Sequence, residues 1–403
     1  MALVSETFTP AVNGVVTSVL RAADHLALRG HEPVVVAPSG QDYETRCGAV
    51  VPVHAVRSVR LPRYRELPLA APTGEVGELL DRIRPDVVHL ASPAVLGSAA
   101  ARAAQERGIP AVAVFQTDLA AYAGRYRVPG GSTTTWRWLR ALHDRTALTL
   151  VPSTPTMAQL RRHGIGPLAL WARGVDLQQF APGRSSAAVR ARLVPGGELL
   201  VGTVARLAVE KRLHLLGPLS ELPGVRLVVV GDGPQRRTLQ RALPRAVFTG
   251  RVVGEELGDL VSSLDLLVHP GADETFCQAV QEALAAGVPA LVAASGGPLD
   301  LVRHGENGWL WAGDDPHVLA AQVAGLRDDR LALRAAAGRA RASVSHRTWG
   351  RLGDELIGHY DRVLGRAQVH PSPPDPRSVD QGCAELRPPA PDLRQEDGLC
   401  GTP

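Results

Sequence analysis

Short runs of aliphatic residues alternate with longer helical patterns along most of this chain, and this alternation limits the folds that it can adopt. In the first half, strands are expected at residues 2–5, 32–37, 86–90, 111–115 and 149–151. Helices are expected between them, at about residues 14–29, 74–82, 93–107, 134–146 and 154–163. Strands separated by helices at this spacing predict a parallel sheet with right-handed crossovers.

The second half repeats the pattern more clearly. Strands are expected at residues 199–204, 225–230, 247–248, 266–269, 290–293 and 308–311, and helices follow most of them. The predicted fold class is therefore α/β, with two doubly wound Rossmann-like domains that face each other across a central cleft. We place the first domain at residues 1–170 and the second at residues 171–347. The helical stretch 348–365 is a candidate to pack back on the first domain.

The two ends of the chain differ from this pattern. Residues 367–403 contain eight prolines and almost no periodic apolar pattern, which is typical of a disordered tail. The first strand candidate has only four residues, fewer than the five or six that are usual in a sheet. We therefore expect the natural start of the protein to lie upstream of Met1.

Composition excludes several classes of protein. A length of 403 residues predicts two to three domains. No apolar stretch reaches about 18 residues, so no transmembrane helix is expected, and no signal peptide is visible. The four cysteines have neither metal-binding spacing nor disulfide density, which indicates a reducing, cytoplasmic compartment. The net charge of +4 is too small to indicate a nucleic-acid-binding protein.

Lysine is almost absent from the sequence. Of the 44 basic residues only Lys211 is a lysine, and the other 43 are arginines. A GC-rich coding bias explains most of the arginines. The alternative for the one remaining lysine is that its position requires a compact ammonium rather than a planar guanidinium.

Ligands of doubly wound domains bind beyond the carboxyl ends of the strands, so the segments after the strands are candidates for a site. Gly14 follows the first strand at the start of a helix, where free N–H groups can approach an anion; an ordinary tight turn is the alternative. Arg206 and Lys211 share the loop after strand 199–204. Two cations on one loop suit a diphosphate, although a solvated basic loop has the same composition.

The segment of residues 269–282 is the most specific. Glu274 lies in the loop after a strand, and Glu282 is expected about two turns into the following helix. The amides of Thr275, Phe276 and Cys277 are expected to face the cleft at the start of that helix. Carboxylates fix the positions of hydroxyl groups by accepting hydrogen bonds, so Glu274 suits a sugar and Glu282 a ribose diol. A loop acid followed by a helix-surface acid is the alternative.

Together these motifs resemble the retaining glycosyltransferases of family 4, which have the GT-B fold. The resemblance covers residues 3–364 and rests on Pro10-x-x-Asn13-Gly14-Val15, Arg206 with Glu210-Lys211, Gly231-Asp232-Gly233 and Glu274-x7-Glu282. Residues 115–118 (FQTD), 171–176 (WARGVD) and 274–278 (ETFCQ) are similar to GDP-mannose-dependent α-mannosyltransferases that act on glycolipids.

The resemblance implies a role for each matching residue. Arg206 and Lys211 would bind the donor diphosphate and stabilise its charge as it leaves, and Gly14 would add a backbone N–H. Glu274 would hold the donor sugar, with the amides of Phe276 and Cys277 nearby, and Glu282 would hold the ribose. The loop that contains Arg251 and Val253 would line the base.

One position departs from the family. Many members have a histidine where this chain has Gln116, and glutamine cannot take a proton at neutral pH. A general base, if one acts, would be Asp118 or the departing phosphate. Asp118 is also a candidate helix N-cap.

No DxD-like cluster demands a divalent metal, since Asp314-Asp315 and Asp328-Asp329 lie near expected helix ends. We therefore expect no cofactor and no metal, with the cations of Arg206 and Lys211 taking over the charge stabilisation. No unambiguous carboxylate nucleophile for a two-step route is found. The resemblance favours front-face attack, with domain closure excluding water.

Two basic stretches with aromatic residues in the first domain suggest an acceptor side at an anionic membrane; half-buried aromatics at a solvated surface are the alternative. The stretches comprise Arg57, Arg60, Arg63, Tyr64 and Arg65, then Arg125, Tyr126, Arg127, Trp136, Arg137, Trp138 and Arg140. The leading hypothesis is thus a peripheral mannosyltransferase at the inner face of the cell membrane, using GDP-mannose and a lipid or glycolipid acceptor. A UDP-sugar donor is a near alternative, and a GT-B epimerase or catalytically silent sugar-nucleotide binder a more distant one.

Overall fold

The computed structural model describes residues 1–11, 13–60, 68–70, 75–121 and 131–365. Several predictions fall outside these ranges. They concern the tail at 367–403 and the membrane candidates Arg63, Tyr64, Arg65, Arg125, Tyr126 and Arg127.

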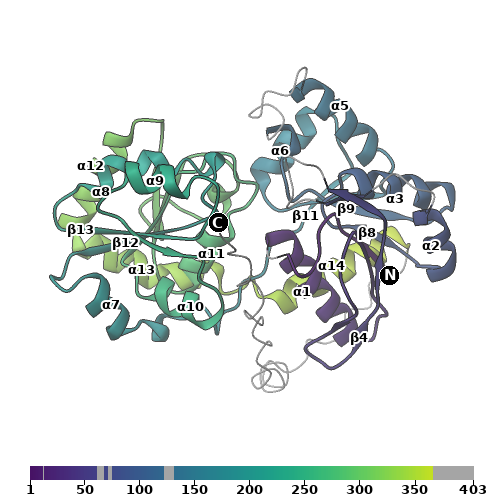
Figure 1. The fold of residues 1–403 in the computed structure, drawn as a ribbon, viewed down its shortest axis with the longest axis horizontal. Coiled ribbons are helices and arrows are strands. Elements are labelled where there is room, and N and C mark those ends of the chain that lie inside the picture. Colours follow the sequence, from purple (N-terminus) through teal and green to yellow (C-terminus); the bar gives the residue numbers. More distant parts are fainter. Residues whose placement is uncertain (12, 61–67, 71–74, 122–130, 366–403) are drawn as a thin grey trace, which may run out of the picture.

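The first half forms a seven-stranded sheet in the order β11-β10-β9-β8-β1-β2-β5, and every neighbouring pair is parallel. Its strands are β1 (Ala2–Val4), β2 (Val34–Ala37), β5 (Val53–Ala55), β8 (Val88–Leu90), β9 (Ala111–Val114), β10 (Leu148–Val151) and β11 (Leu168–Leu170). Helices lie on both faces of this sheet (Figure 1). They are α1 (Gly14–Leu28), α2 (Glu75–Ile83), α3 (Val95–Glu106), α5 (Gly131–His143) and α6 (Thr154–Arg162).

The second half forms a six-stranded parallel sheet in the order β14-β13-β12-β15-β16-β17. Its strands are β12 (Leu199–Val204), β13 (Val225–Val230), β14 (Val247–Gly250), β15 (Leu266–His269), β16 (Ala290–Ala293) and β17 (Gly308–Trp311). The helices are α7 (Ala187–Leu193), α8 (Gly217–Ser220), α9 (Arg236–Ala242), α10 (Gly254–Ser262), α11 (Gln278–Ala285), α12 (Pro316–Asp328), α13 (Arg330–Val344) and α14 (Trp349–Val363). Four short 3-10 helices are η1 (Pro182–Arg184), η2 (Val209–Lys211), η3 (Leu213–Leu216) and η4 (Gly297–Asp300).

The prediction of two Rossmann-like domains is confirmed. Five of the six strands expected in the second half have the predicted bounds, because these strands are buried on both faces and therefore read as uninterrupted apolar runs. The edge strands β5 and β11 were not predicted, since each has only three residues and all of these are at least partly exposed. The short antiparallel pairs β3 (Tyr43–Glu44) with β4 (Val50–Val51), and β6 (Ser58–Arg60) with β7 (Pro68–Ala70), were also missed.

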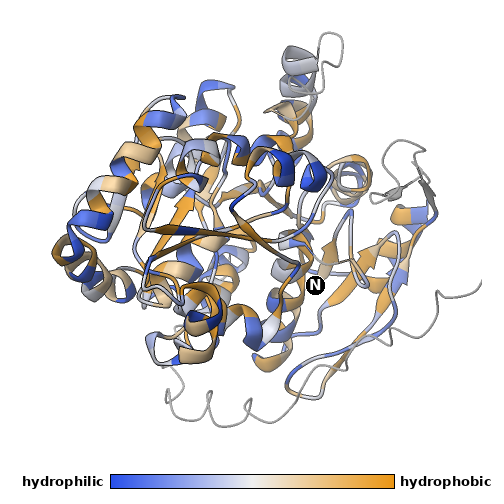
Figure 2. Ribbon diagram, turned by 60° about the vertical axis from the view of Figure 1, so that its left-hand side comes forward, coloured by the Kyte–Doolittle hydropathy of each residue, from blue (hydrophilic) through white to orange (hydrophobic). Residues whose placement is uncertain are grey.

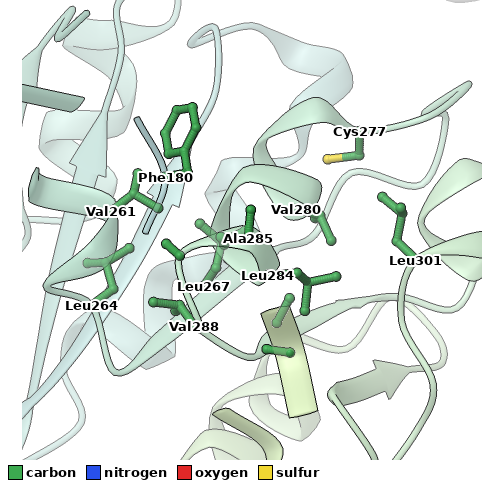
Figure 3. Close-up of a cluster of buried hydrophobic side chains, with 14 of the residues drawn as sticks. Phe180, Val261, Leu264, Leu267, Cys277, Val280, Leu284, Ala285, Val288 and Leu301 are labelled. Carbon is green, nitrogen blue, oxygen red and sulfur yellow. The ribbon is translucent and has the colours of Figure 1, made fainter. Parts of the chain in front are cut away.

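The strands of both sheets are mostly hydrophobic (Figure 2), and buried apolar residues of strands and helices form clusters in both domains. In the second domain one such cluster joins strand residues such as Leu267 to Val280 and Leu284 of α11 (Figure 3). In the first domain the helix α14 contributes to the core, although it comes from the far end of the chain. Its Leu356 and Tyr360 pack with Leu26 of α1, and the two helices lie side by side in Figure 1.

Sheet topology determines where a ligand can bind. In each sheet, successive strands are first added on one side of the starting strand and later on its other side. This change of side falls between β1 and β8 in the first sheet and between β12 and β15 in the second. A crevice forms at the carboxyl ends of the strands at such a switch point. The loops after β12 and β15 are those that contain Lys211 and Glu274.

The described helices also bear on the question of a membrane anchor. Not one of them combines the length and apolar character needed to cross a bilayer.

Candidate functional site

The loops after β12 and β15 bring the one lysine of the chain to the first carboxylate of the Glu274-x7-Glu282 motif. Lys211 Nζ lies 2.5 Å from Glu274 Oε1, and both side chains are largely buried, with 23% and 15% of their surfaces exposed. Lys211 is the last residue of the 3-10 helix η2, within the loop region that follows β12. Arg206, five residues earlier, is exposed at the end of β12.

A histidine that the sequence did not single out completes this contact. His269 is the last residue of β15 and is buried, and its Nε2 lies 2.8 Å from the same oxygen of Glu274. Burial would raise the pKa of Glu274, but Lys211 and His269 outweigh burial and hold this pKa well below its usual range. Burial would lower the pKa of His269, whereas Cys277 and Glu274 raise it, to about 10. A carboxylate with two cationic partners therefore faces the cleft.

Glycines allow the surrounding loops to approach this cluster. A Cβ added to Gly231 would lie 2.0 Å from the carbonyl oxygen of Ala205, so the Gly231-Asp232-Gly233 turn packs directly on the loop that contains Arg206. A Cβ added to Gly297 would lie 2.4 Å from Cα and 2.5 Å from N of Phe276. The Gly297 amide in addition donates a hydrogen bond of 2.7 Å to the Glu274 carbonyl. These contacts fix the backbone on either side of the cluster.

The three residues after Glu274 have different surroundings. Thr275 Oγ1 donates a hydrogen bond of 2.9 Å to the carbonyl of Gln116, and the Thr275 carbonyl accepts one of 2.7 Å from Ser153 Oγ. Both partners belong to the first domain. Phe276 and Cys277 belong to the buried apolar cluster of the second domain, and Figure 3 shows Cys277 at its edge. Cys277 has a positive φ of 82° directly before α11.

Glu282 lies one turn into α11 rather than the predicted two, because the helix begins only at Gln278. Burial raises the pKa of its carboxyl to about 7, although Gln278 and Arg173 act in the opposite direction. Arg173 links this region to Gly14, since its guanidinium donates hydrogen bonds to the Gly14 carbonyl and, over 2.7 Å, to Ser18 Oγ. Gly14 is exposed at the first position of α1, with Arg173 beside it.

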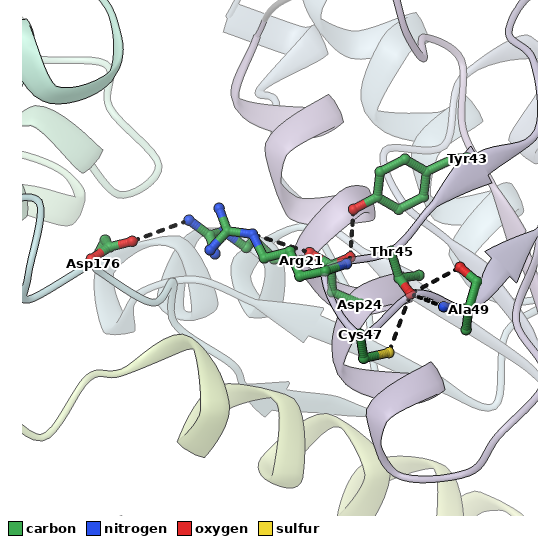
Figure 4. A network of polar contacts seen from close by, with 8 residues as sticks. Arg21, Asp24, Tyr43, Thr45, Cys47, Ala49 and Asp176 are labelled. Carbon is green, nitrogen blue, oxygen red and sulfur yellow. Dashed lines mark hydrogen bonds and ion pairs between the residues drawn. The ribbon is translucent and has the colours of Figure 1, made fainter. Parts of the chain in front are cut away.

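A second link between α1 and the other half of the chain lies close by. Arg21 of α1 donates a hydrogen bond of 3.4 Å to Asp176, and Figure 4 shows it extending from α1 toward that carboxylate. Asp24, on the same helix, accepts a hydrogen bond from the Tyr43 hydroxyl. The orientation of α1 is thus fixed from both sides.

Asp118 faces Glu274 across the space between the domains. One cavity of about 240 Å³ is lined by both residues, together with Gln159 and Thr275. A neighbouring cavity of about 420 Å³ is lined by Asp118, Gln159, Trp136 and others. The Asp118 carboxylate accepts hydrogen bonds of 2.8 Å from the Ala121 amide and from Gln159 Nε2. The Ala121 contact is typical of a helix N-cap, so the capping alternative fits the geometry while the carboxylate still borders the cavity.

Gln116 borders the same region but is turned inward. Its Nε2 donates a hydrogen bond of 2.6 Å to the Ala91 carbonyl. A side chain held in this way orients its neighbours and cannot accept a proton from a substrate.

Arg251 and Val253 are not brought to the cluster by the described contacts. They follow β14, which β13 separates from β12 at the edge of the sheet, and both are exposed. They border the outer part of the carboxyl edge, consistent with a role at the far end of an elongated ligand.

The acids at the helix ends have structural partners. Asp315 caps α12 and Asp329 caps α13 through backbone hydrogen bonds. Asp328 pairs with Arg327, and Asp314 with Arg212. Among the described residues, the one group with a metal-ligating composition is His269, Glu274 and Cys277, whose candidate ligand atoms lie within 4.8 Å of one another. Lys211 contacts the same Glu274 oxygen, and its ammonium would repel a metal cation there.

Several residues of this site were missed by the sequence analysis. His269, Ser153 and Gln159 hold or border the predicted residues, whereas Arg173 belongs to the motif of residues 171–176 but was given no role of its own. Only His269 had a recognisable signal, as a polar residue that ends a buried strand immediately before the Glu274 loop.

Comparison with known proteins follows this division of the chain. Residues 12–179 match the sequence model for Glycosyltransferase Family 4, and residues 187–343 match that for Glycosyl transferases group 1. The chain is 45% identical to a GDP-mannose-dependent alpha-mannosyltransferase of Mycobacterium tuberculosis, over 91% of this chain and 97% of the relative. It is 43% identical to the enzyme of the same name from Corynebacterium glutamicum, over 92% and 91%.

Solved structures show the same fold. Anabaena HepE in complex with UDP-glucose superposes with a TM-score of 0.72 and 20% identity, covering 90% of this chain and all of that one. The GT-B architecture predicted from the motifs is therefore confirmed.

Replacing Gly297 tests the close packing under the Glu274 loop. Gly297→Ala would place a methyl group against the backbone of Phe276, which cannot move away like a flexible side chain. We expect the free energy of unfolding to fall by about 1–3 kcal/mol, measured by urea denaturation. Gly338→Ala is the matched control, since its Cβ meets nothing within 4 Å inside α13 and should add about 1 kcal/mol of helix stability. Equal stabilities of Gly297→Ala and the unmodified protein would contradict the packing argument.

The raised pKa of the half-buried Glu282 carboxyl predicts a pH dependence of stability. Its pKa is about 7 in the folded protein against an ordinary value of 4.5. Between these values the folded state holds a proton that the unfolded state has lost, so the free energy of unfolding falls as pH rises and levels off above about pH 7. Glu282→Gln should remove this slope in denaturation series from about pH 4 to pH 8. Glu255→Gln, at a side chain 88% exposed, is the control. Parallel curves for Glu282→Gln and the unmodified protein would refute the assignment.

Proposed function

Because the chain belongs to glycosyltransferase family 4, we propose that it transfers mannose from GDP-mannose to a lipid or glycolipid acceptor. We further propose that the reaction retains the anomeric configuration and needs no metal ion. The observation that carries the proposal is the Glu274 carboxylate, held by Lys211 and His269 at the border of a cavity shared by both domains. Its setting suits a group that accepts hydrogen bonds from sugar hydroxyls.

The choice of donor rests on the relatives. Two proteins that are 43% and 45% identical to this chain over more than 90% of its length are GDP-mannose-dependent alpha-mannosyltransferases by name. This supports GDP-mannose over a UDP-sugar, whereas the likeness to the UDP-glucose complex of HepE extends to the fold alone. Arg251 and Val253, exposed beyond β14, are candidates to border the base.

The cations of the site support a reaction without a metal. Arg206 and Lys211 follow the central strand β12, at the switch point where a diphosphate would bind. Positioned cations stabilise the charge that develops on a leaving diphosphate, and the loss of one such group costs about 10²–10³ in rate. Gly14 at the start of α1 and Glu282 near Arg173 are candidates for further contacts with the phosphates and the ribose.

The carboxylates of the cavity favour front-face attack over a two-step route. A covalent intermediate requires a free carboxylate oxygen beneath the anomeric carbon. Both oxygens of Asp118 accept hydrogen bonds. Lys211 and His269 hold Oε1 of Glu274 and lower the pKa of this carboxyl, so its remaining oxygen is a weak nucleophile. The departing phosphate can instead accept the proton of the attacking hydroxyl on the same face of the sugar, which yields retention.

The decisive experiment supplies GDP-mannose and a membrane lipid extract in the presence of EDTA. We expect a mannosylated lipid and released GDP, detected by mass spectrometry and thin-layer chromatography. Release of GDP without a mannosylated product would indicate hydrolysis, and binding without release a silent sugar-nucleotide binder. Loss of transfer with EDTA, restored by Mg²⁺, would refute metal independence.

Two variants connect this reaction to the site. Glu274→Ala should lower the rate of transfer by about 10²-fold or more. It should leave the affinity for GDP largely unchanged, because Glu274 is proposed to contact the sugar of the donor. Lys211→Ala should weaken both transfer and GDP binding, because its partner is the diphosphate. Lys211→Arg should also impair donor use, since a guanidinium differs in shape from an ammonium. Normal transfer by Lys211→Ala would refute the diphosphate assignment.

We also propose that the first domain binds the cytoplasmic face of an anionic membrane. Arg57 is exposed, as are Arg137 and Arg140 on α5, and each basic residue near such a surface can add about 1 kcal/mol. The aromatic residues support this less, because Trp136 is half-buried and stacks on His163 with ring centroids 3.7 Å apart. Co-sedimentation with phosphatidylglycerol vesicles should decrease as salt increases and in an Arg137→Glu/Arg140→Glu variant. Binding that is absent at low salt would refute the proposal.

A further inference from the structure

We propose that His269 is a positioning residue for the donor sugar: together with Lys211 it holds one oxygen of Glu274, so that the other oxygen is presented to the sugar hydroxyls. This inference rests on the proposed function, in which Glu274 accepts hydrogen bonds from the sugar. His269 itself would not touch the donor.

The geometry places both partners on the same atom. His269 Nε2 lies 2.8 Å and Lys211 Nζ 2.5 Å from Glu274 Oε1. The two donors approach from different strands, since His269 ends β15 and Lys211 follows β12. A carboxylate held at one oxygen by two donors from separate elements cannot rotate without breaking one of these contacts.

The second oxygen of Glu274 is left for a ligand. Within the described part of the chain, no hydrogen bond or ion pair to Glu274 Oε2 is found. Glu274 lines the cavity of about 240 Å³ that Asp118 borders from the first domain. An ionised carboxylate oxygen accepts hydrogen bonds only, so Oε2 suits the hydroxyl groups of a sugar.

The approach of His269 is itself built into the loop. A Cβ added to Gly271 would lie 2.8 Å from His269 Nε2 and 3.3 Å from Glu274 Oε1. The loop can pass over the contact only because this residue has no side chain. Since Nε2 faces an acceptor, it must carry the proton, and the raised pKa of His269 is consistent with an imidazolium here.

Two substitutions of His269 distinguish a positioning role from that of a side chain that only fills the core. His269→Gln retains an N–H donor at a similar reach, whereas His269→Leu retains bulk without a donor. His143→Gln is the matched control, because His143 is also buried and hydrogen-bonded, to Thr149 of the first domain, and is not part of the site. All three are measured for thermal unfolding, for GDP and GDP-mannose affinity, and for kcat and KM.

We expect His269→Leu to bind GDP within about twofold of the unmodified protein and to lose about 10²-fold in kcat/KM for GDP-mannose, as for a small misplacement of a catalytic contact. His269→Gln should recover at least half of this loss on a logarithmic scale. In a Glu274→Ala background, His269→Gln should not change the affinity for GDP-mannose further. His143→Gln should alter only the unfolding temperature.

Three outcomes would overturn the inference. The first is an unchanged kcat/KM for GDP-mannose in His269→Leu, and the second is an equal loss of kcat/KM in His269→Gln and His269→Leu. The third is a loss of GDP-mannose affinity caused by His269→Gln that persists in the Glu274→Ala background. If His269→Leu does not fold, the Glu274→Ala cycle with His269→Gln still decides. Transfer of mannose by Glu274→Ala alone would instead refute the proposed function, so the two failures are distinguishable.

Discussion

The ion pair between Lys211 and Glu274 is the interaction on which the organisation of the site depends. A carboxylate that is 15% exposed is costly to keep ionised unless charged partners replace water. Lys211 and His269 supply that replacement, and they come from the two strands that flank the switch point of the second sheet. The sheet therefore provides both the crevice and the pair of cations that allow an acid to persist in it. If coding bias alone determined the basic residues, arginine would be expected at position 211 as it is elsewhere. The contact with Glu274 instead suits a compact ammonium, because its neighbours are close.

Much of this arrangement follows from the sequence, and the part that does not has a physical reason. Buried parallel strands such as β12 and β15 are apolar runs, so their bounds were predictable, and the loops that follow them contain Arg206, Lys211 and Glu274. The edge strands β5 and β11 and the pair of β3 and β4 lack this pattern because they have only two or three residues each, most of them at least partly exposed. His269 could not be assigned a partner, since its contact with Glu274 depends on how the intervening turn folds. Glu282 was placed one turn too deep because the left-handed backbone of Cys277 delays the start of α11.

Backbone packing is as specific as the charges. The turn at Gly231 touches the carbonyl of Ala205, and Gly297 touches the backbone of Phe276. Each contact brings a neighbouring strand's loop closer than any other residue would allow. Precise placement of Arg206 and Glu274 therefore depends on residues that have no functional group. This dependence also explains why glycines such as Gly231 occur in the motifs together with charged residues, although they offer no side chain to a ligand.

The loop of Glu274 also connects the two domains. The Thr275 hydroxyl donates to the Gln116 carbonyl and the Thr275 carbonyl accepts from Ser153, so the residue next to Glu274 is held by the first domain through two hydrogen bonds. Asp118 borders the same cavity from that domain. Separation of the domains would break these hydrogen bonds beside the carboxylate, so closing the cleft and orienting Glu274 are energetically coupled. An enzyme that transfers a sugar rather than hydrolysing its donor must exclude water when the reactive groups are aligned. The loop beside the key carboxylate gains its hydrogen bonds to Gln116 and Ser153 only when the two domains are in contact, which links the alignment of this loop to the closure of the cleft.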